Sequence, residues 1–155
     1  MPITLIKAIR EDCFEIFEMQ KNAFKALLDK YQDYDTNPGA EKPERIVWRF
    51  DEEETDYYFI TLENRHIGAI RIRNLGEKCE LKQIFILPEY QGNGYAQETI
   101  RLVEELYPDA VLWELDTILQ EKKLCHLYEK MGYKKTGKTE NIKEGMDIVF
   151  YEKRK

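Results

Sequence analysis

The spacing of apolar residues changes partway between residues 84 and 107. The run Ile-Phe-Ile-Leu at 84–87 is continuous and stops at Pro88, which is typical of a strand covered on both faces. Farther along, apolar residues recur every three or four positions, which predicts an amphipathic helix. Its stripe holds Ala96, Ile100, Val103 and Tyr107. Between strand and helix lies the glycine-containing turn QGNGYA, where free amides at a helix start favour an anion.

The first third of the chain predicts one strand, two helices and a loop. Residues 3–9 alternate as a strand, and a helix should follow from about residue 11 to residue 28. The predicted buried face of this helix holds Phe14, Phe17, Phe24, Leu27 and Leu28. Residues 31–43 contain two prolines and a glycine, which indicates a loop. Residues 44–51 predict a short helix with Val47, Trp48 and Phe50 partly packed.

The middle of the chain predicts an antiparallel meander. Residues 56–63 and 66–74 are rich in β-branched and aromatic residues, and Asn64-Arg65 between them indicates a hairpin. A further strand at 79–87 leads into the glycine turn. After the central helix, 110–116 is another apolar strand, so that strand, helix and strand form one crossover.

The last part of the chain predicts a helix and two strands. Residues 119–131 form the helix, and Gly132 follows at the position where a left-handed residue ends helices. Its predicted inward residues are Leu124, Leu127, Tyr128 and Met131. Two strands then surround Gly145. The whole order predicts an α+β fold, with a mixed, mostly antiparallel sheet flanked by helices. We expect one domain over residues 1–155.

Composition narrows the classes of function. A chain with 43% apolar and 35% charged residues, without a long apolar run or a leader pattern, is expected in the cytoplasm. The net charge of −6 argues against nucleic acid or an anionic membrane as the main partner and suits a cationic substrate. Three cysteines without CxxC spacing indicate neither a disulfide framework nor a zinc site, and we expect no metal.

Two known phosphate-binding loops fit the glycine turn poorly. A Walker-type loop needs a Gly-Lys-Ser/Thr sequence, and this turn has no lysine. A dinucleotide-binding turn fits better, because Asp116 ends the next strand. However, Gln97 replaces its third glycine, an antiparallel meander precedes it, and too few residues follow Asp116 to complete a doubly wound sheet. The dinucleotide interpretation therefore ranks second.

The residues of the turn have a closer match. The run Gln91-Gly92-Asn93-Gly94-Tyr95-Ala96 resembles the Gln/Arg-x-x-Gly-x-Gly/Ala motif of the GNAT superfamily of acyl-CoA-dependent N-acyltransferases. The segment LYEKMGYKKTG at 127–137 is similar to that superfamily's second block, Leu-Tyr-x-Lys-x-Gly-Phe. Two blocks in the right order make the resemblance specific.

The resemblance implies how acetyl-CoA would bind. Its pyrophosphate would lie on the turn amides of Gly92, Asn93, Gly94, Tyr95 and Ala96. Its pantetheine arm would pair with the carbonyl of Ile84 and the amide of Ile86, which requires strand 110–116 to splay away from that edge. The Gln91 side chain would close the turn or reach a phosphate.

The resemblance also implies catalytic roles. The Ile86 amide would polarise the thioester carbonyl, and Tyr128 would protonate the CoA sulfur; for Tyr128 a core tyrosine is the second interpretation. Glu80 stands where some members carry a glutamate base, but the pattern favours a solvated strand residue. Glu121 replaces a frequent asparagine. Because no motif pairs Cys125 with an activating base, we expect direct transfer.

The sequence leaves the acceptor open. Acidic residues at 33, 35 and 52–54 are most simply solvated loop charge, but with Tyr31, Tyr34 and Trp48 they could line a site for a cationic amine. We therefore predict an N-acetyltransferase that moves an acetyl group from acetyl-CoA to a primary amine of a small molecule or peptide. The alternative is a non-catalytic acyl-CoA-binding sensor or interaction domain. The oligomeric state is open, with a homodimer among the options.

Overall fold

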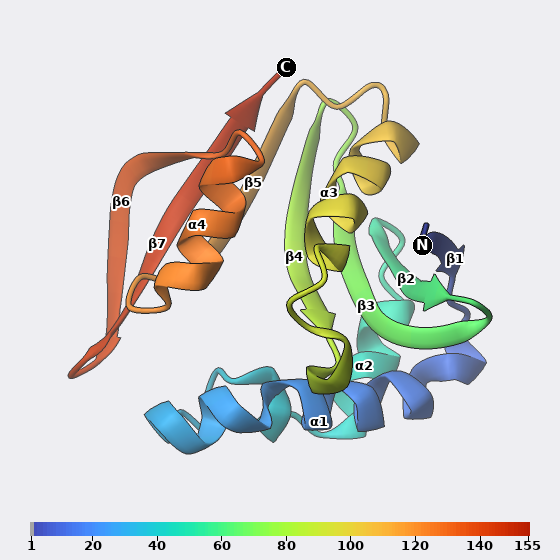
Figure 1. Cartoon of the computed structure of the whole chain (residues 1–155), viewed down its shortest axis with the longest axis horizontal. Coiled ribbons are helices and arrows are strands. Elements are labelled where there is room, and N and C mark those ends of the chain that lie inside the picture. The colour runs from blue at the N-terminus through green and yellow to red at the C-terminus, as the bar shows by residue number, and fades with distance from the viewer. Residues whose placement is uncertain (1) are drawn as a thin grey trace.

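A seven-stranded sheet with helices on both faces organises the chain in a computed structural model that describes residues 2–155 (Figure 1). The strands are β1 (Thr4–Lys7), β2 (Thr55–Leu62), β3 (Arg65–Asn74), β4 (Lys78–Ile86), β5 (Leu112–Ile118), β6 (Lys134–Lys143) and β7 (Met146–Arg154). The helices are α1 (Cys13–Tyr31), α2 (Pro43–Phe50), α3 (Tyr95–Leu106) and α4 (Lys122–Lys130). Within these residues, no helix combines the length and apolar character needed to cross a bilayer.

The sheet is mixed, as predicted. Its strand order is β1-β2-β3-β4-β5-β7-β6, and β4 with β5 is the parallel pair, while the other neighbours run antiparallel. Helix α3 makes the crossover from β4 to β5. The predicted α+β class and the order of elements are therefore confirmed.

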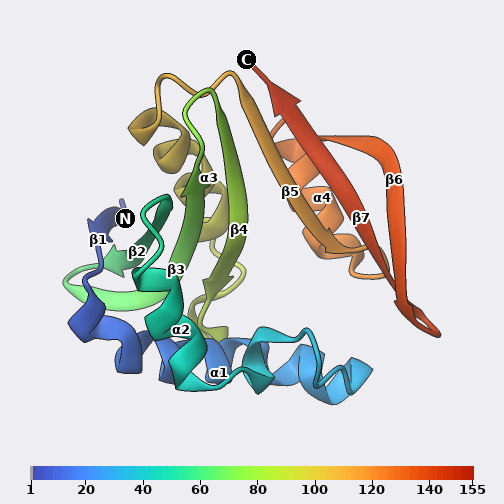
Figure 2. The ribbon, with the colours of Figure 1, turned by 180° about the vertical axis from the view of Figure 1, so that it is seen from behind.

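The parallel pair is short, and the sheet opens beyond it. Pairing between β4 and β5 stops at Glu80 opposite Glu114, whereas β5 continues alongside β7 as far as Ile118. The two strands then diverge, so that the sheet forms a V (Figures 1 and 2). Strands β1 to β4 make its first arm, and strands β5 to β7 make its second arm. A bulge at Lys82 interrupts β4 just past the last pair, and bulges bend and twist the strand that carries them. The predicted splaying of β5 away from β4 is thus present.

Separate helices cover the two faces of the sheet. Ile16 of α1 and Ile46 of α2 are fully buried against Phe59 and Phe85 of the first arm. On the opposite face, α3 packs over β4, and α4 packs over β5 and β7. Burial of these apolar side chains is the main force that holds both arms in place.

The buried face of α1 differs from the prediction. Ile16, Met19 and Gln20 are its buried residues, whereas Phe14 is 63% exposed and contacts Phe17 at the surface. The prediction took the aromatic residues as the buried stripe. Phe17 and Phe24 do pack against the core as half-buried residues, but the buried stripe is centred on Met19. The helix also continues three residues beyond the predicted end, to Tyr31.

Other differences are local. The two-residue turn between β2 and β3 is Glu63-Asn64, and both residues have positive φ, as such hairpin turns require. In α2 the buried residues are Ile46 and Arg49, and Trp48 is exposed. In α4 the most buried residues are Cys125 and Tyr128, while the other predicted inward residues are half-buried.

Candidate active site

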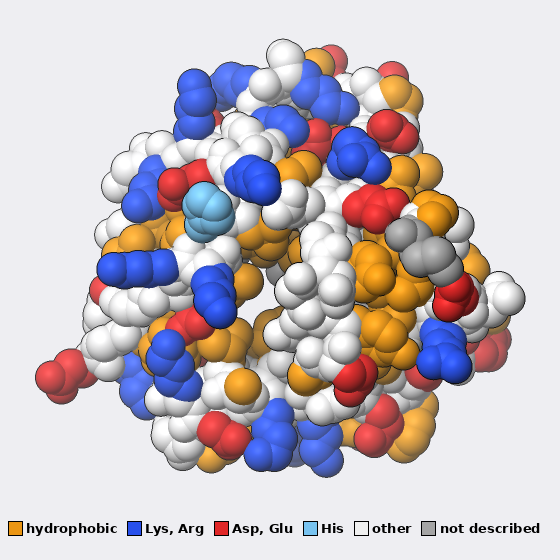
Figure 3. Space-filling model, in the orientation of Figure 1, with side chains coloured by type: hydrophobic (Ala, Val, Ile, Leu, Met, Phe, Trp, Pro, Cys, Tyr) orange, Lys and Arg blue, Asp and Glu red, His pale blue; other side chains and the backbone are white. Residues whose placement is uncertain are grey.

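A cavity of about 590 Å³ occupies the opening between the two arms (Figure 3). The second half of β4 forms one wall, and β5 from Asp116 to Ile118 forms the other. Gln91 and Ala96 of the glycine turn reach the cavity, as does Tyr128 of α4. Residues of α1, of α2 and of the segment between them form a further side of the cavity. The cavity therefore joins every segment that the sequence motifs singled out.

Beyond Glu80, the edge of β4 that faces the cavity has no strand partner among the described residues. The amide of Leu87 donates to the carbonyl of Ile67 in β3 at 2.8 Å. Because backbone groups alternate in direction along an antiparallel strand, those of Ile84 and Ile86 point away from β3 and into the opening. The Ile86 carbonyl accepts a hydrogen bond from Gln91 Nε2 at 2.8 Å, so Gln91 closes the turn. The Ile86 amide and the Ile84 backbone groups are left available to a ligand.

The glycine turn presents unpaired amides beside this edge. Gly92 and Gly94 have φ of +81° and +79°, and a Cβ at either would meet nothing within 4 Å. Asn93 Nδ2 donates to the carbonyls of Tyr90 and Gln91 and so fixes the turn. The amide of Glu98 donates to Gly94 O at 3.2 Å, so the preceding amides at the start of α3 have no helical acceptor. This arrangement suits a phosphate.

Tyr128 is the phenol that reaches the cavity. It is 6% exposed and packs against the rings of Tyr133 and Tyr151. Its hydroxyl hydrogen-bonds to nothing within residues 2–155. Burial, and next the negative charge of Asp116, raise the pKa of Tyr128 well above its usual range. The phenol is therefore protonated at neutral pH and available as a donor.

Asp116 is a carboxylate on the same cavity. It lies on β5 opposite Phe150 and forms no hydrogen bond or ion pair with another described residue. Although Asp116 is exposed to solvent, the cavity walls partly desolvate its carboxyl group and so raise its pKa, while the positive charge of Lys82 acts in the opposite direction. A carboxyl group with a raised pKa and no partner is suited to exchange protons.

The sequence model of the acetyltransferase (GNAT) family matches residues 15–133. The chain belongs to this family. One relative is the uncharacterized protein YrkN of Bacillus subtilis (strain 168), which is 30% identical over 79 residues. That match covers 49% of this chain and 43% of YrkN, so this chain spans less than half of that relative's length.

Solved GNAT structures share the fold. PaiA N-acetyltransferase from Thermoplasma acidophilum in complex with coenzyme A has a TM-score of 0.74 at 17% identity over 100% of both chains. RimL, a ribosomal L7/L12 alpha-N-protein acetyltransferase in complex with coenzyme A, gives 0.77 at 11% identity, over 99% of this chain and 94% of RimL. AAC(6')-Ib with ribostamycin and coenzyme A gives 0.75 at 14%, over 100% and 94%.

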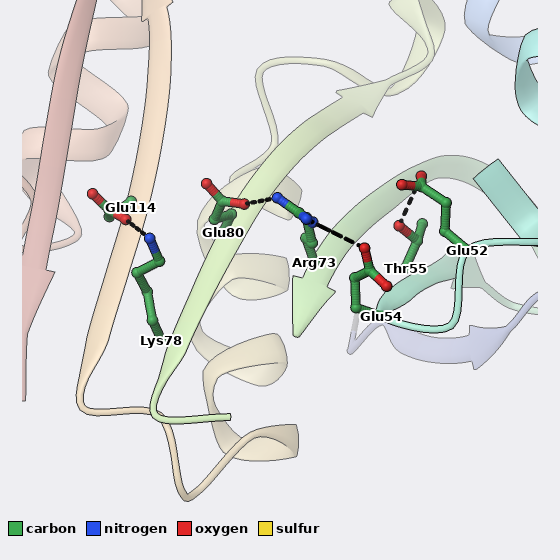
Figure 4. A network of polar contacts seen from close by, with 7 residues as sticks. All are labelled: Glu52, Glu54, Thr55, Arg73, Lys78, Glu80 and Glu114. Carbon is green, nitrogen blue, oxygen red and sulfur yellow. Dashed lines mark hydrogen bonds and ion pairs between the residues drawn. The ribbon is translucent and has the colours of Figure 1, made fainter. Parts of the chain in front are cut away.

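Glu80, the predicted base, lies outside the cavity of this GNAT protein. It stands at the last paired position of β4, where Arg73 Nη1 contacts it at 3.2 Å (Figure 4). Arg73 also contacts Glu54, and Lys78 bridges to Glu114 on β5. This network ties the closed end of the V together. The geometry therefore favours a structural role for Glu80, as in the solvated-strand interpretation.

The predicted acceptor residues divide into two groups. The hydroxyl of Tyr31 donates to Glu121 at 2.5 Å, and the carbonyl of Tyr31 accepts from Lys143, so the end of α1 is tied to the second arm. Tyr34 and Trp48 are 62% and 55% exposed, and none of the three aromatic residues lines the cavity. Asp33, which the same prediction included, is buried and does line the cavity. Glu121 is occupied by this contact and by Lys30.

Sequence reasoning overlooked Asp116 as a possible base, although a signal was present. In the strand around it, Trp113 and Leu115 pack into the core, and alternation places Asp116 on the opposite face. Together with the expected splaying of β5, this alternation could have placed Asp116 beside the opening. From the sequence alone, Asp116 instead supported the dinucleotide-binding interpretation.

Proposed function

We propose that this GNAT protein transfers an acetyl group from acetyl-CoA directly to a primary amine within the cavity between β4 and β5. The observation that carries this proposal is the meeting of two features at one place: the unpaired edge of β4 and the free amides of the glycine turn. The presence of coenzyme A in the solved PaiA and RimL structures supports the same cofactor here.

The residues present fit two parts of acetyl-CoA. The amides of residues 92–96 would hold its pyrophosphate, since the space beside Gly92 and Gly94 is open. The backbone groups of Ile84 would pair with the pantetheine arm as an added strand does, which leaves the Ile86 amide for the acetyl group. Acetyl-CoA would supply the acetyl group as a thioester.

Three groups of the chain would then handle charge and protons. The Ile86 amide donates to the developing oxyanion of the acetyl group. Asp116 accepts one proton from the attacking amine, because the amine must lose a proton to become an amide. Tyr128 holds a proton for the departing thiolate and regains it from solvent through the cavity. Asp116 replaces Glu80 in this assignment because it reaches the cavity without a partner of its own.

Incubation of purified protein with acetyl-CoA and a panel of amines tests the proposal. Release of free thiol that depends on the amine, together with an acetylated product by mass spectrometry, is the expected result. The Asp116→Asn variant is the control, and it should release thiol far more slowly. Tight CoA binding without thiol release for any amine would instead favour the sensor or interaction domain.

A further inference from the structure

A row of polar side chains crosses the first arm beside the cavity. Tyr57 of β2, Arg71 of β3 and Gln83 of β4 are directly opposite one another in the sheet. They share the sheet face that α1 and α2 cover, since Tyr57 and Phe85 belong to that core. Arg71 and Gln83 line the cavity. The row therefore ends at the strand that also offers its edge to the cofactor.

Arg71 is unpaired within the part of the chain that the structure describes. Across residues 2–155, its guanidinium makes no hydrogen bond and no ion pair, and its Nε is fully buried. The buried hydroxyl of Tyr57 also finds no acceptor, and Gln83, 8% exposed, makes no side-chain hydrogen bond with the described residues. Burial of an unpaired charge is costly, so such a site favours an anion from outside.

Glu41, a carboxylate that also lines the cavity, is hydrogen-bonded to other residues. Both oxygens of Glu41 accept from the Arg49 guanidinium, and Oε1 also accepts from Gln20 Nε2 at 2.7 Å. Glu41 thus bonds directly to Arg49 and forms no hydrogen bond with Arg71, on which Glu41 and Glu52 act only through their charge. Burial, and next the like charge of Arg49, lower the pKa of Arg71, which agrees with this geometry.

We propose that Arg71, assisted by Gln83, binds a carboxylate of the acceptor, so that the acceptor is a small amine that also carries a carboxylate, such as an amino acid. This inference rests on the proposed function. Arg71 lies directly across from Gln83, and the usual spacing of such cross-strand pairs is about 5 Å. Gln83 immediately precedes Ile84, whose backbone groups lie on the open edge of β4. Asp116 faces the same cavity from the opposite arm. The proposal requires one molecule to place its amine near Asp116 while its carboxylate lies on Arg71.

The cavity also offers apolar surface. Phe24 and Leu27 of α1 line it from one side and Ile148 of β7 from the other, beside polar residues such as Asp33 and Glu140. The apolar residues can contact the side chain of an apolar amino acid. The same cavity must also hold the acetyl end of the cofactor, which favours a small acceptor over a polymer.

Matched pairs of amines test the carboxylate site. We would compare L-leucine with isoamylamine, L-methionine with 3-(methylthio)propylamine, and L-phenylalanine with phenethylamine, because the members of each pair differ by the carboxylate. The wild type should acetylate the carboxylated member with a kcat/KM at least about tenfold higher. In Arg71→Gln the ratio of the two kcat/KM values should fall to about one, chiefly because kcat/KM for the carboxylated amine falls.

Arg73→Gln is the matched control. Arg73 lies two residues farther along β3 but is ion-paired with Glu54 and Glu80, and it does not line the cavity. The control should therefore keep the wild-type ratio. A wild type without preference for carboxylated amines would overturn the inference, and so would an Arg71→Gln variant that slows both members of a pair equally. Gln83→Ala, expected to lower the ratio by less, gives a second variant if Arg71→Gln folds poorly.

Calorimetry separates this inference from the proposed function. The CoA-bound protein would be titrated with L-leucine and with isoamylamine, for the wild type and for Arg71→Gln. If no amine is acetylated but leucine binds in an Arg71-dependent way, the carboxylate site stands and the transfer function fails. Leucine binding that is equal to isoamylamine binding, or unchanged in Arg71→Gln, would overturn the site.

Discussion

Replacement of Gly94 by leucine should abolish most of the affinity for CoA, and a second glycine in the chain provides the reference. Gly94 begins α3 with a φ of +79°, and Gly76 in the turn before β4 has a φ of +89°. A Cβ at either glycine would meet nothing within 4 Å. Left-handed backbone costs a residue with a side chain about 1–2 kcal/mol, so both variants should lose similar stability.

The two variants should differ in their affinity for CoA. The space beside Gly94 is open, so we expect a leucine there to crowd a phosphate on the turn amides, and loss of even one hydrogen bond from an amide to a charged phosphate costs about 1.5–3 kcal/mol. The Kd for CoA should therefore rise by at least about tenfold in Gly94→Leu. In Gly76→Leu it should stay within about twofold, because that turn lies at the closed end of the V.

Isothermal titration calorimetry gives both Kd values, and urea unfolding gives both stabilities. Equal losses of stability with unequal losses of affinity would support a phosphate site at the turn. If Gly94→Leu binds CoA as tightly as Gly76→Leu does, the glycine turn is only a structural link between β4 and α3.

Three further predictions concern single side chains. Asp116→Asn should lower kcat/KM by about 10²- to 10⁴-fold. The wild-type kcat/KM should fall as pH falls through the raised pKa of Asp116, and a low-pH limb that persists in the variant would exclude Asp116 as the base. Tyr128→Phe should lower kcat by about tenfold or more with a CoA Kd within about twofold, and unchanged turnover would remove its acid role. Glu41→Gln should destabilise the protein by about 3 kcal/mol at pH 7 in urea unfolding, because it leaves Arg49 buried without its counter-charge. Burial alone would raise the pKa of Glu41, but Arg49 holds it lower, so this stabilisation is present above the usual pKa of about 4.3 and is lost as pH falls through the folded value. A difference that stays constant with pH would contradict the pairing.

Hydrophobic spacing was enough to predict the strands, the helices and the crossover, because these depend on local periodicity. The opening between β4 and β5 followed from the resemblance to the GNAT motifs and is present in the structure. The buried face of α1 was not predicted, since Phe14 and Met19 are both apolar and only their position against the sheet distinguishes them.

The charged residues show the limit of sequence patterns most clearly. Arg71 and Arg73 are two residues apart on β3 and share one face of the sheet by alternation. Only the arrangement in space reveals that Arg73 is paired with Glu80, while Arg71 faces the cavity without a carboxylate. For the same reason the proposed base is Asp116, which lines the cavity, and not Glu80, which is paired with Arg73.

Hydrogen exchange at one amide tests most directly whether the open edge of β4 receives the cofactor. The Ile86 amide faces the opening, whereas the next amide, that of Leu87, is already bonded to Ile67 and serves as an internal reference. At saturating acetyl-CoA, exchange at Ile86 should slow by at least about tenfold while exchange at Leu87 changes little. An Ile86 amide that exchanges equally fast with and without acetyl-CoA would contradict the account.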